Sequence, residues 1–166
     1  MGESFILKKD GSKVMTVSDR LAKVIASVVF VGYIPFAPGT WGSLVSLLFI
    51  YVCNPSLIWQ FSMISFLIAI GTWACYKVES QWDKDDKRIV VDEFVGMLIT
   101  MFGIHLEISN LLVGFFLFRL FDILKPFPIR NIEARFQNGI GVMLDDIVAG
   151  IFGNICLRVI LIIKPF

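Results

Sequence analysis

The sequence predicts an all-α fold, that of a polytopic helical membrane protein with about four to five spans and a short re-entrant or interfacial N-terminal helix. Composition, the lengths of the apolar segments and a one-sided distribution of charge lead to this prediction. The 166-residue chain is 57% hydrophobic and only 17% charged, with a mean hydropathy of +0.79. A soluble domain is typically about 45–50% apolar and about 25% charged. A soluble protein with a buried helical core is therefore the weaker alternative.

Six apolar segments follow one another, and their lengths set the number of predicted spans. A spanning helix needs about 20 apolar residues, with a range of about 17–25. Three segments reach this range: Leu57–Tyr76, Ile108–Leu124 and Ile147–Ile163. Ile108–Leu124 can span only if its Arg119 and Asp122 face protein rather than lipid. Two are short for a span: Trp41–Cys53 and Ile89–Ile104. Val24–Tyr33 is too short to cross, and we expect the interfacial or re-entrant helix there.

Positive charge gathers on one side of the predicted topology. We expect the chain to start inside, cross outward at Trp41–Cys53, return at Leu57–Tyr76, and cross three more times. Five Lys and Arg residues then precede position 24, four lie between 77 and 88, and four between 119 and 135, leaving two of the 15 elsewhere. The positive-inside rule makes the rich side the cytoplasm. We predict one integral-membrane domain over residues 1–166, with residues 1–20 as a cytoplasmic lead-in.

Carboxylates collect on the same side, although the positive-inside rule does not require it. Every Asp and Glu except Glu107 falls on or near the predicted cytoplasmic face. Four motifs stand there, each at the end of an apolar segment: PFAPGTWGS (35–43), VDEFVG (91–96), FRLFDILKPFPIR (118–130) and GVMLDDIVAG (141–150). Ionisable residues within membrane spans are costly to desolvate, so these motifs are functional candidates.

Asp92 and Asp146 each begin a helical face that continues with small residues. The residues that follow on these faces are Gly96, Thr100 and Gly103 in the first case and Ala149, Gly150 and Gly153 in the second. Small residues let helices pack closely in membranes. We therefore expect both acids to face the bundle. Glu93 and Asp145 point about 100° away and are predicted to be second ligands or orienting groups.

The charged residues of the motifs suit a metal ion and a phosphate. Five acids would repel one another without a cation: Asp92, Glu93, Asp122, Asp145 and Asp146. Oxygen ligands without Cys or His favour a hard ion, most simply Mg²⁺. Basic side chains and a Pro-Gly turn before a helix offer donors to a phosphate, namely Arg119, Lys125, Arg130, Gly39 and Thr40. This combination predicts phosphoryl transfer or phosphate-ester hydrolysis.

Together, the motifs PGTWGS, IVVDEFVGM, FRLFDILKPFPIR and GVMLDDIVAG resemble those of the phosphatidylglycerophosphatase A family of bacterial inner-membrane lipid phosphatases. The resemblance is collinear over roughly residues 30 to 155. It implies a multi-pass enzyme that hydrolyses phosphatidylglycerophosphate to phosphatidylglycerol and phosphate, with Mg²⁺, at the cytoplasmic membrane face. The family's acids map onto the five carboxylates above, and its basic partners onto Arg119, Lys125 and Arg130. Residues 83–88 depart from relatives that carry His and Gly there, so they receive no catalytic weight.

The nucleophile is either a metal-activated water or a carboxylate. We favour water, with Asp92, Asp122 and Asp146 holding the ion and Glu93 or Asp145 accepting the proton. Two alternatives use the same acidic cluster: a lipid-phosphate transferase and a cation transporter. The chain lacks the acid pattern of the first and the polar path of the second. A net charge of +1 gives no indication of nucleic-acid binding, and the sequence leaves the oligomeric state open.

Overall fold

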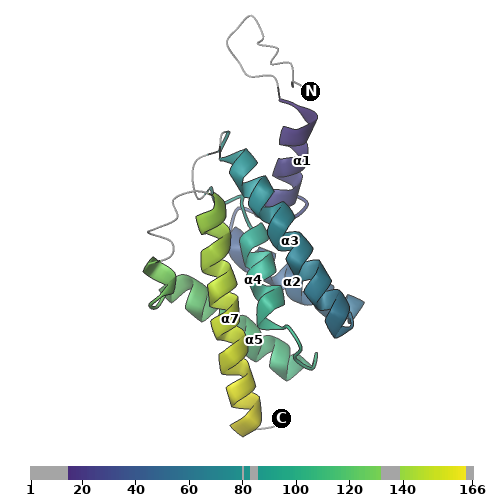
Figure 1. Cartoon of the computed structure of the whole chain (residues 1–166), viewed down its shortest axis with the longest axis vertical. Helices are drawn as coiled ribbons and strands as arrows, with labels where there is room; N and C mark the ends of the chain where they lie inside the picture. The colour runs from purple at the N-terminus through teal and green to yellow at the C-terminus, as the bar shows by residue number, and fades with distance from the viewer. Residues whose placement is uncertain (1–14, 80, 83–85, 132–138, 164–166) are drawn as a thin grey trace, which may run out of the picture.

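The computed structural model describes residues 15–79, 81–82, 86–131 and 139–163, which form helices and loops without any strand. The elements are α1 (Val17–Ala26), the 3₁₀ helix η1 (Val31–Tyr33), α2 (Pro38–Cys53), α3 (Leu57–Val78), α4 (Val91–Thr100), α5 (Ile108–Leu124) and α7 (Gly139–Ile163). Figure 1 shows their arrangement along the longest axis of the molecule. The predicted all-α class is confirmed for this part of the chain.

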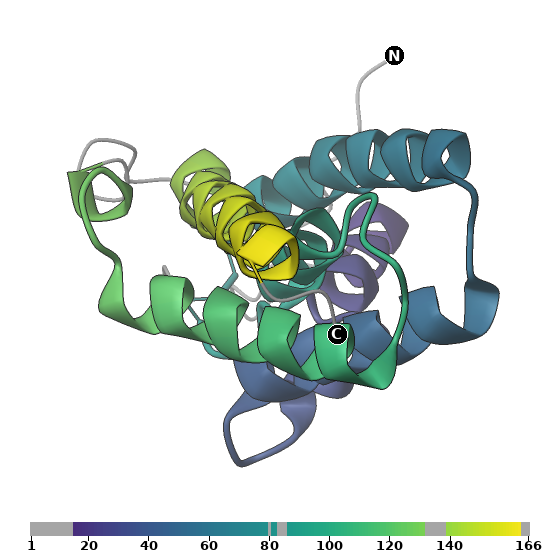
Figure 2. The ribbon, with the colours of Figure 1, turned by 90° about the horizontal axis from the view of Figure 1, so that it is seen from below.

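Helix α4 lies at the centre of the bundle, where it contacts α2, α3, α5 and α7. Figure 2 shows α3 and α5 on opposite sides of the α4–α7 pair. Eight of the 10 residues of α4 are buried. A helix that is apolar on nearly all sides is expected to be surrounded by protein. Its Met97 and Leu98 pack with Phe118 of α5 and Leu157 of α7 in the main hydrophobic cluster.

Helix lengths bear on how the chain meets a membrane. By length and composition, two helices could cross one, α3 with 22 residues and α7 with 25. Helices α2 and α5 have 16 and 17 residues. Helix α4 has only 10, or about 15 Å at 1.5 Å per residue, half the thickness of a bilayer's hydrocarbon core. The apolar run Ile89–Ile104 therefore contains a half-length helix, which ends at Thr100 before a turn where Gly103 has φ +66°.

The prediction of one short helix over Val24–Tyr33 is wrong. Helix α1 begins earlier because Thr16 and Asp19 form a capping box, in which each side chain accepts a hydrogen bond from the other residue's backbone N–H. It ends at Ala26, and after the C-cap residue Ser27 three residues have positive φ angles of 45°, 52° and 70°: Val28, Val29 and Phe30. The left-handed segment stops the helix, and η1 is a separate turn.

The motif PFAPGTWGS also folds differently from the expected turn before a helix. Pro38 and Gly39 form the first turn of α2, after Ala37 at the N-cap with φ 46°. Proline suits this position because its missing N–H would have no partner inside the helix anyway. The helix therefore starts before the apolar run, which carries the motif to the end of the bundle.

Candidate active site

The four motifs meet at one end of the bundle, where they line a cavity of about 390 Å³. Its walls come from the starts of α2 and α4, the end of α5 and the first turns of α7. All five predicted carboxylates line it, together with Arg119, Lys125 and Gly39. The structure thus brings together residues that are up to 107 positions apart, from Gly39 to Asp146.

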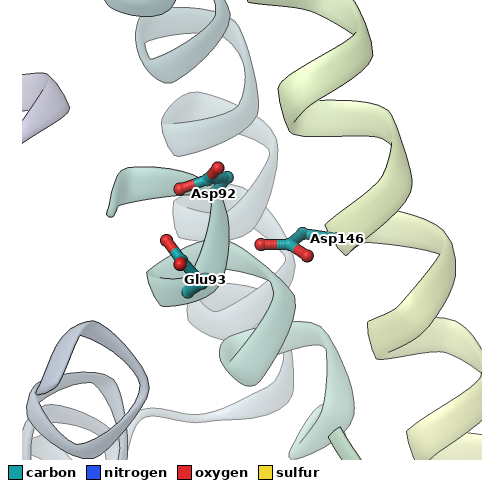
Figure 3. Close-up of side chains that lie close together, drawn as sticks. All are labelled: Asp92, Glu93 and Asp146. Carbon is teal, nitrogen blue, oxygen red and sulfur yellow. The ribbon is translucent and has the colours of Figure 1, made fainter. Parts of the chain in front are cut away.

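Three of the carboxylates form a compact group, shown in Figure 3. Asp92 and Glu93 lie in the first turn of α4, and Asp146 faces them from α7. One carboxylate oxygen from each lies within 4.8 Å of the others. Asp92 and Asp146 are only 9% and 4% exposed. Three acids this close and this buried strongly repel one another unless a positive charge joins them.

Two oxygens in this group indicate where such a charge would sit. Asp92 Oδ1 and Glu93 Oε2 are buried and accept no hydrogen bond from the described residues. A buried oxygen without a partner is costly, and a cation would satisfy both atoms. An oxygen-only ligand set suits Mg²⁺ better than a transition metal. Asp92, Glu93 and Asp146 are therefore the residues that could hold an ion.

The other two predicted carboxylates, Asp122 and Asp145, already have basic partners. Lys125 Nζ donates a hydrogen bond to Asp145 Oδ2 at 2.6 Å. Arg119 Nη1 lies 2.5 Å from Asp122 Oδ2, one helical turn along α5. The sequence analysis favoured Asp122 as the third residue to hold the ion, whereas the compact group contains Glu93 instead. The ion pairs keep Arg119 and Lys125 inside the cavity, where they could also donate to an anion.

Gly39 lies directly against the acid group. A Cβ atom added to it would be 2.0 Å from Glu93 Oε1, so the absence of a side chain makes room for this carboxylate. The N-termini of α2 and α4 both open on the cavity. Helix N-termini carry partial positive charge, which favours the carboxylates of Asp92 and Glu93 and any bound phosphate.

Two residues of the predicted phosphate-binding set lie outside the cavity lining. Thr40 is half-buried, and its N–H donates to Ala37 O within the first turn of α2. Arg130 is exposed beyond the end of α5. Of that predicted set, the structure therefore brings Arg119, Lys125 and Gly39 to the acids.

Two lining residues were missed by the sequence analysis, Asp86 and Lys87. They belong to residues 83–88, to which the sequence analysis gave no catalytic weight and of which residues 83–85 lie outside the described residues. Arg88 donates to both carboxylate oxygens of Asp86, and this pairing lowers the pKa of Asp86 below its usual value. The guanidinium of Arg88 also stacks on Trp82 at 4.4 Å. The sequence feature that could have identified Asp86 and Lys87 as site residues is their position shortly before Asp92 and Glu93.

A buried carboxylate group beside paired basic residues, at one end of a helical bundle, suits an enzyme that acts on a phosphate ester. The family model described as phosphatidylglycerophosphatase A matches residues 24–161. The chain belongs to this family, and it is a phosphatase. The resemblance seen in the motifs is confirmed.

Two of the curated relatives carry the name of this family, and a third is named for another lipid phosphate. The chain is 39% identical to the phosphatidylglycerophosphatase A of Haemophilus influenzae over 130 residues, covering 75% of this chain and 78% of that protein. It is 39% identical to that of Escherichia coli over 124 residues, covering 72% of each. It is also 38% identical over 140 residues to a putative phosphatidylinositol-3-phosphatase of Bacteroides thetaiotaomicron, covering 77% of this chain and 86% of that protein. No solved structure matches the chain.

Proposed function

We propose that the protein hydrolyses phosphatidylglycerophosphate to phosphatidylglycerol and inorganic phosphate, with Mg²⁺, at the cytoplasmic face of a bacterial inner membrane. One observation carries the proposal. A single cavity is lined by six carboxylates, two of which have buried oxygens without hydrogen-bond partners among the described residues, together with Arg119 and Lys125. These groups suit the binding of a metal ion and a phosphomonoester. The name of the matching family indicates that phosphatidylglycerophosphate is the lipid that carries the phosphate.

The chemistry divides between the compact acid group and the ion pairs. Mg²⁺ held by Asp92, Glu93 and Asp146 would neutralise charge on the phosphate when bound. Arg119 and Lys125 donate hydrogen bonds to the phosphate oxygens. Phosphoryl transfer passes through a loose transition state, so positioning and charge account for most of the rate.

Asp145 and Lys125 can act as the general base and the general acid of the reaction. Water forms the new bond to phosphorus as the bond between phosphorus and the glycerol oxygen breaks. Asp145 accepts a proton from the water, and Lys125 gives one to the departing glycerol oxygen. The 2.6 Å hydrogen bond between the two side chains then returns the proton from Asp145 to Lys125. The lipid alcohol and inorganic phosphate leave, and the site is restored.

A membrane position suits both the helices and the substrate. Helices α2 and α3 present apolar side chains outward, among them Leu48, Ile58 and Phe66, which are 63%, 79% and 63% exposed. The cavity lies at the ends of helices, where a lipid phosphate sits at headgroup depth while its acyl chains stay in the bilayer. We propose that α2, α3, α5 and α7 cross the membrane and that α4 crosses only half of it. Labelling of single cysteines at positions 87 and 105 in inside-out vesicles tests this topology, which requires opposite accessibility.

Phosphatidylinositol 3-phosphate is a second candidate substrate, because a relative of 38% identity is named a putative phosphatidylinositol-3-phosphatase. Both lipids carry a phosphomonoester on a headgroup that is joined to the lipid through a phosphodiester. Parallel assays with the two lipids decide between them by the ratio of kcat/KM.

The test is phosphate release by the detergent-purified protein, with Mg²⁺ and with excess EDTA. We expect release from phosphatidylglycerophosphate that needs the metal and is lost in Asp92→Asn and Asp146→Asn. Glu107→Gln is the matched control, since this carboxylate is exposed at the start of α5, at the other end of that helix from Asp122. Release that persists in EDTA or in both Asp variants would contradict the metal–carboxylate site.

A further inference from the structure

Helices α4 and α7 run side by side from the cavity in the same direction, as Figure 1 shows. Their contacts repeat at a constant offset of 54 positions. At the cavity end Asp92 and Asp146 face each other, and at the far end Asn154 donates to Thr100 O across the same offset. Eight residues separate the two positions on each helix, or about 12 Å. The two helices therefore keep one register along the full length of α4.

Glycines make the contact between these two points close. A Cβ on Gly150 would lie 2.4 Å from Gly96 O, and a Cβ on Gly96 would lie 2.8 Å from Asp146 O. Thr100 Oγ1 lies 3.3 Å from Gly150 O, within hydrogen-bond distance. This close packing helps to hold the helices together, but a smooth glycine surface offers little resistance to sliding along the axis.

Polar groups at the far end supply that resistance. Asn154 Nδ2 donates to Thr100 O at 2.8 Å and to Phe102 O at 3.0 Å. Arg158, one turn further along α7, donates from Nη2 to Phe102 O and from Nε to Asn154 Oδ1, both at 2.8 Å. Together these bonds satisfy carbonyls at and just beyond the C-terminus of α4, which have no partner inside the helix. Within a bilayer such groups must find partners in the protein.

We propose that Asn154, held by Arg158, is a positioning residue that fixes the register of α4 against α7 and thereby the placement of Asp92 and Glu93 against Asp146. A slip of one residue would move the acids by about 1.5 Å and turn them by about 100°. The acid group is compact within 4.8 Å, so even part of such a slip opens it. The inference rests on the proposed function: its kinetic test needs the lipid phosphatase activity, whereas its second test needs only the metal site.

The experiment replaces Asn154 by Leu, which has similar size and no donors, and by Gln, which keeps the amide. In Asn154→Leu we expect kcat to fall by about 10- to 100-fold, the loss typical of an ångström-scale misplacement. The KM for the lipid should stay within about twofold, because the donors to the phosphate are untouched. Asn154→Gln should recover part of kcat. Ile155→Ala is the matched control, since its side chain is the next on α7 and is 54% exposed.

A second readout does not depend on the substrate. Mg²⁺ or Mn²⁺ should raise the melting temperature of the wild-type protein and of Ile155→Ala, and should raise that of Asn154→Leu much less. If Asn154→Leu does not fold, Arg158→Gln carries the test, because Arg158 is exposed and its loss removes the support of Asn154. Arg158→Lys should then restore part of the metal response.

The outcomes are distinct. Wild-type protein that releases no phosphate from any lipid would overturn the proposed function, while the metal response would still test the register. The inference would be overturned if Asn154→Leu had the same metal response and kcat as Ile155→Ala. The same holds for Arg158→Gln where that variant is used. A KM that changes by more than about twofold together with a lower kcat, without rescue by Asn154→Gln, would overturn it as well.

Discussion

The substitution Gly39→Ala tests the acid group with little disturbance of the fold. The new Cβ would lie 2.0 Å from Glu93 Oε1, and real Cβ atoms essentially never approach closer than 3.0 Å, so the carboxylate must move by at least about 1 Å. The obstacle is the end of a side chain rather than backbone, so α2 and α4 need not separate. Alanine also favours helix over glycine, by about 1 kcal/mol.

We therefore expect Gly39→Ala to keep its melting temperature in detergent and to lose about 100-fold in kcat. The assay is phosphate release at saturating Mg²⁺, with a thermal melt of the same preparation. Gly114→Ala is the control, because its Cβ also meets a flexible side chain, the sulfur of Met101 at 2.7 Å, and Gly114 does not line the cavity. Wild-type kcat in Gly39→Ala would refute the role given to Glu93. A large fall in melting temperature would refute the argument that only the side chain moves.

Three further results are expected. Gly150→Ala places Cβ 2.4 Å from a backbone oxygen of α4, so the helices must separate and the protein should lose about 1–3 kcal/mol of stability, measured by thermal or denaturant unfolding in mild detergent. Lys125→Met removes the ammonium group that donates to Asp145 Oδ2 at 2.6 Å and should lower kcat by about 100-fold; a loss below tenfold would contradict the proton roles. Arg130→Met should cost less than Lys125→Met in the same assay, because Arg130 lies outside the cavity lining.

Much of the fold follows from the lengths of the apolar runs. Helices α3 and α5 begin at the predicted residues, Leu57 and Ile108, because uninterrupted apolar sequence leaves the chain few other ways to satisfy its backbone. Helix α7 begins eight residues before the predicted run, at Gly139, since its paired acids face a cavity and do not interrupt the helix. Helix α1 was misplaced because its start depends on a polar cap rather than on hydrophobicity.

The end of α4 was hidden from the sequence for a different reason. Residues Met101 to Ile104 continue the apolar run, so composition alone extends the helix through them. What stops it is tertiary: Asn154 and Arg158 take its last carbonyls, and Gly103 turns the chain. Those two polar residues lie more than 50 positions away, and no local pattern connects them to α4.

The sequence predicted most of the charged residues that line the cavity, but not which of them contact one another. The motifs identified five of the six acids and two of the three basic residues that line the cavity. The choice of Glu93 over Asp122 for the compact group depends on which side chain Arg119 neutralises and on the room left by Gly39. The first is a contact along one face of α5 and the second a contact between α2 and α4. Spacing in the sequence shows which residues are near one another, but it does not determine which contacts form.

The parallel packing of α4 and α7 also determines where the chain can change length. Residues added between Ile104 and Gly139 would alter the offset of 54 between the paired positions without changing any contact between the two helices. One residue added between Asp146 and Asn154 would instead shift one end of α7 by about 1.5 Å relative to the other and rotate it by about 100°. Insertions and deletions are therefore compatible with the fold in the connecting segments, whereas the eight-residue intervals on α4 and α7 have to change together or not at all.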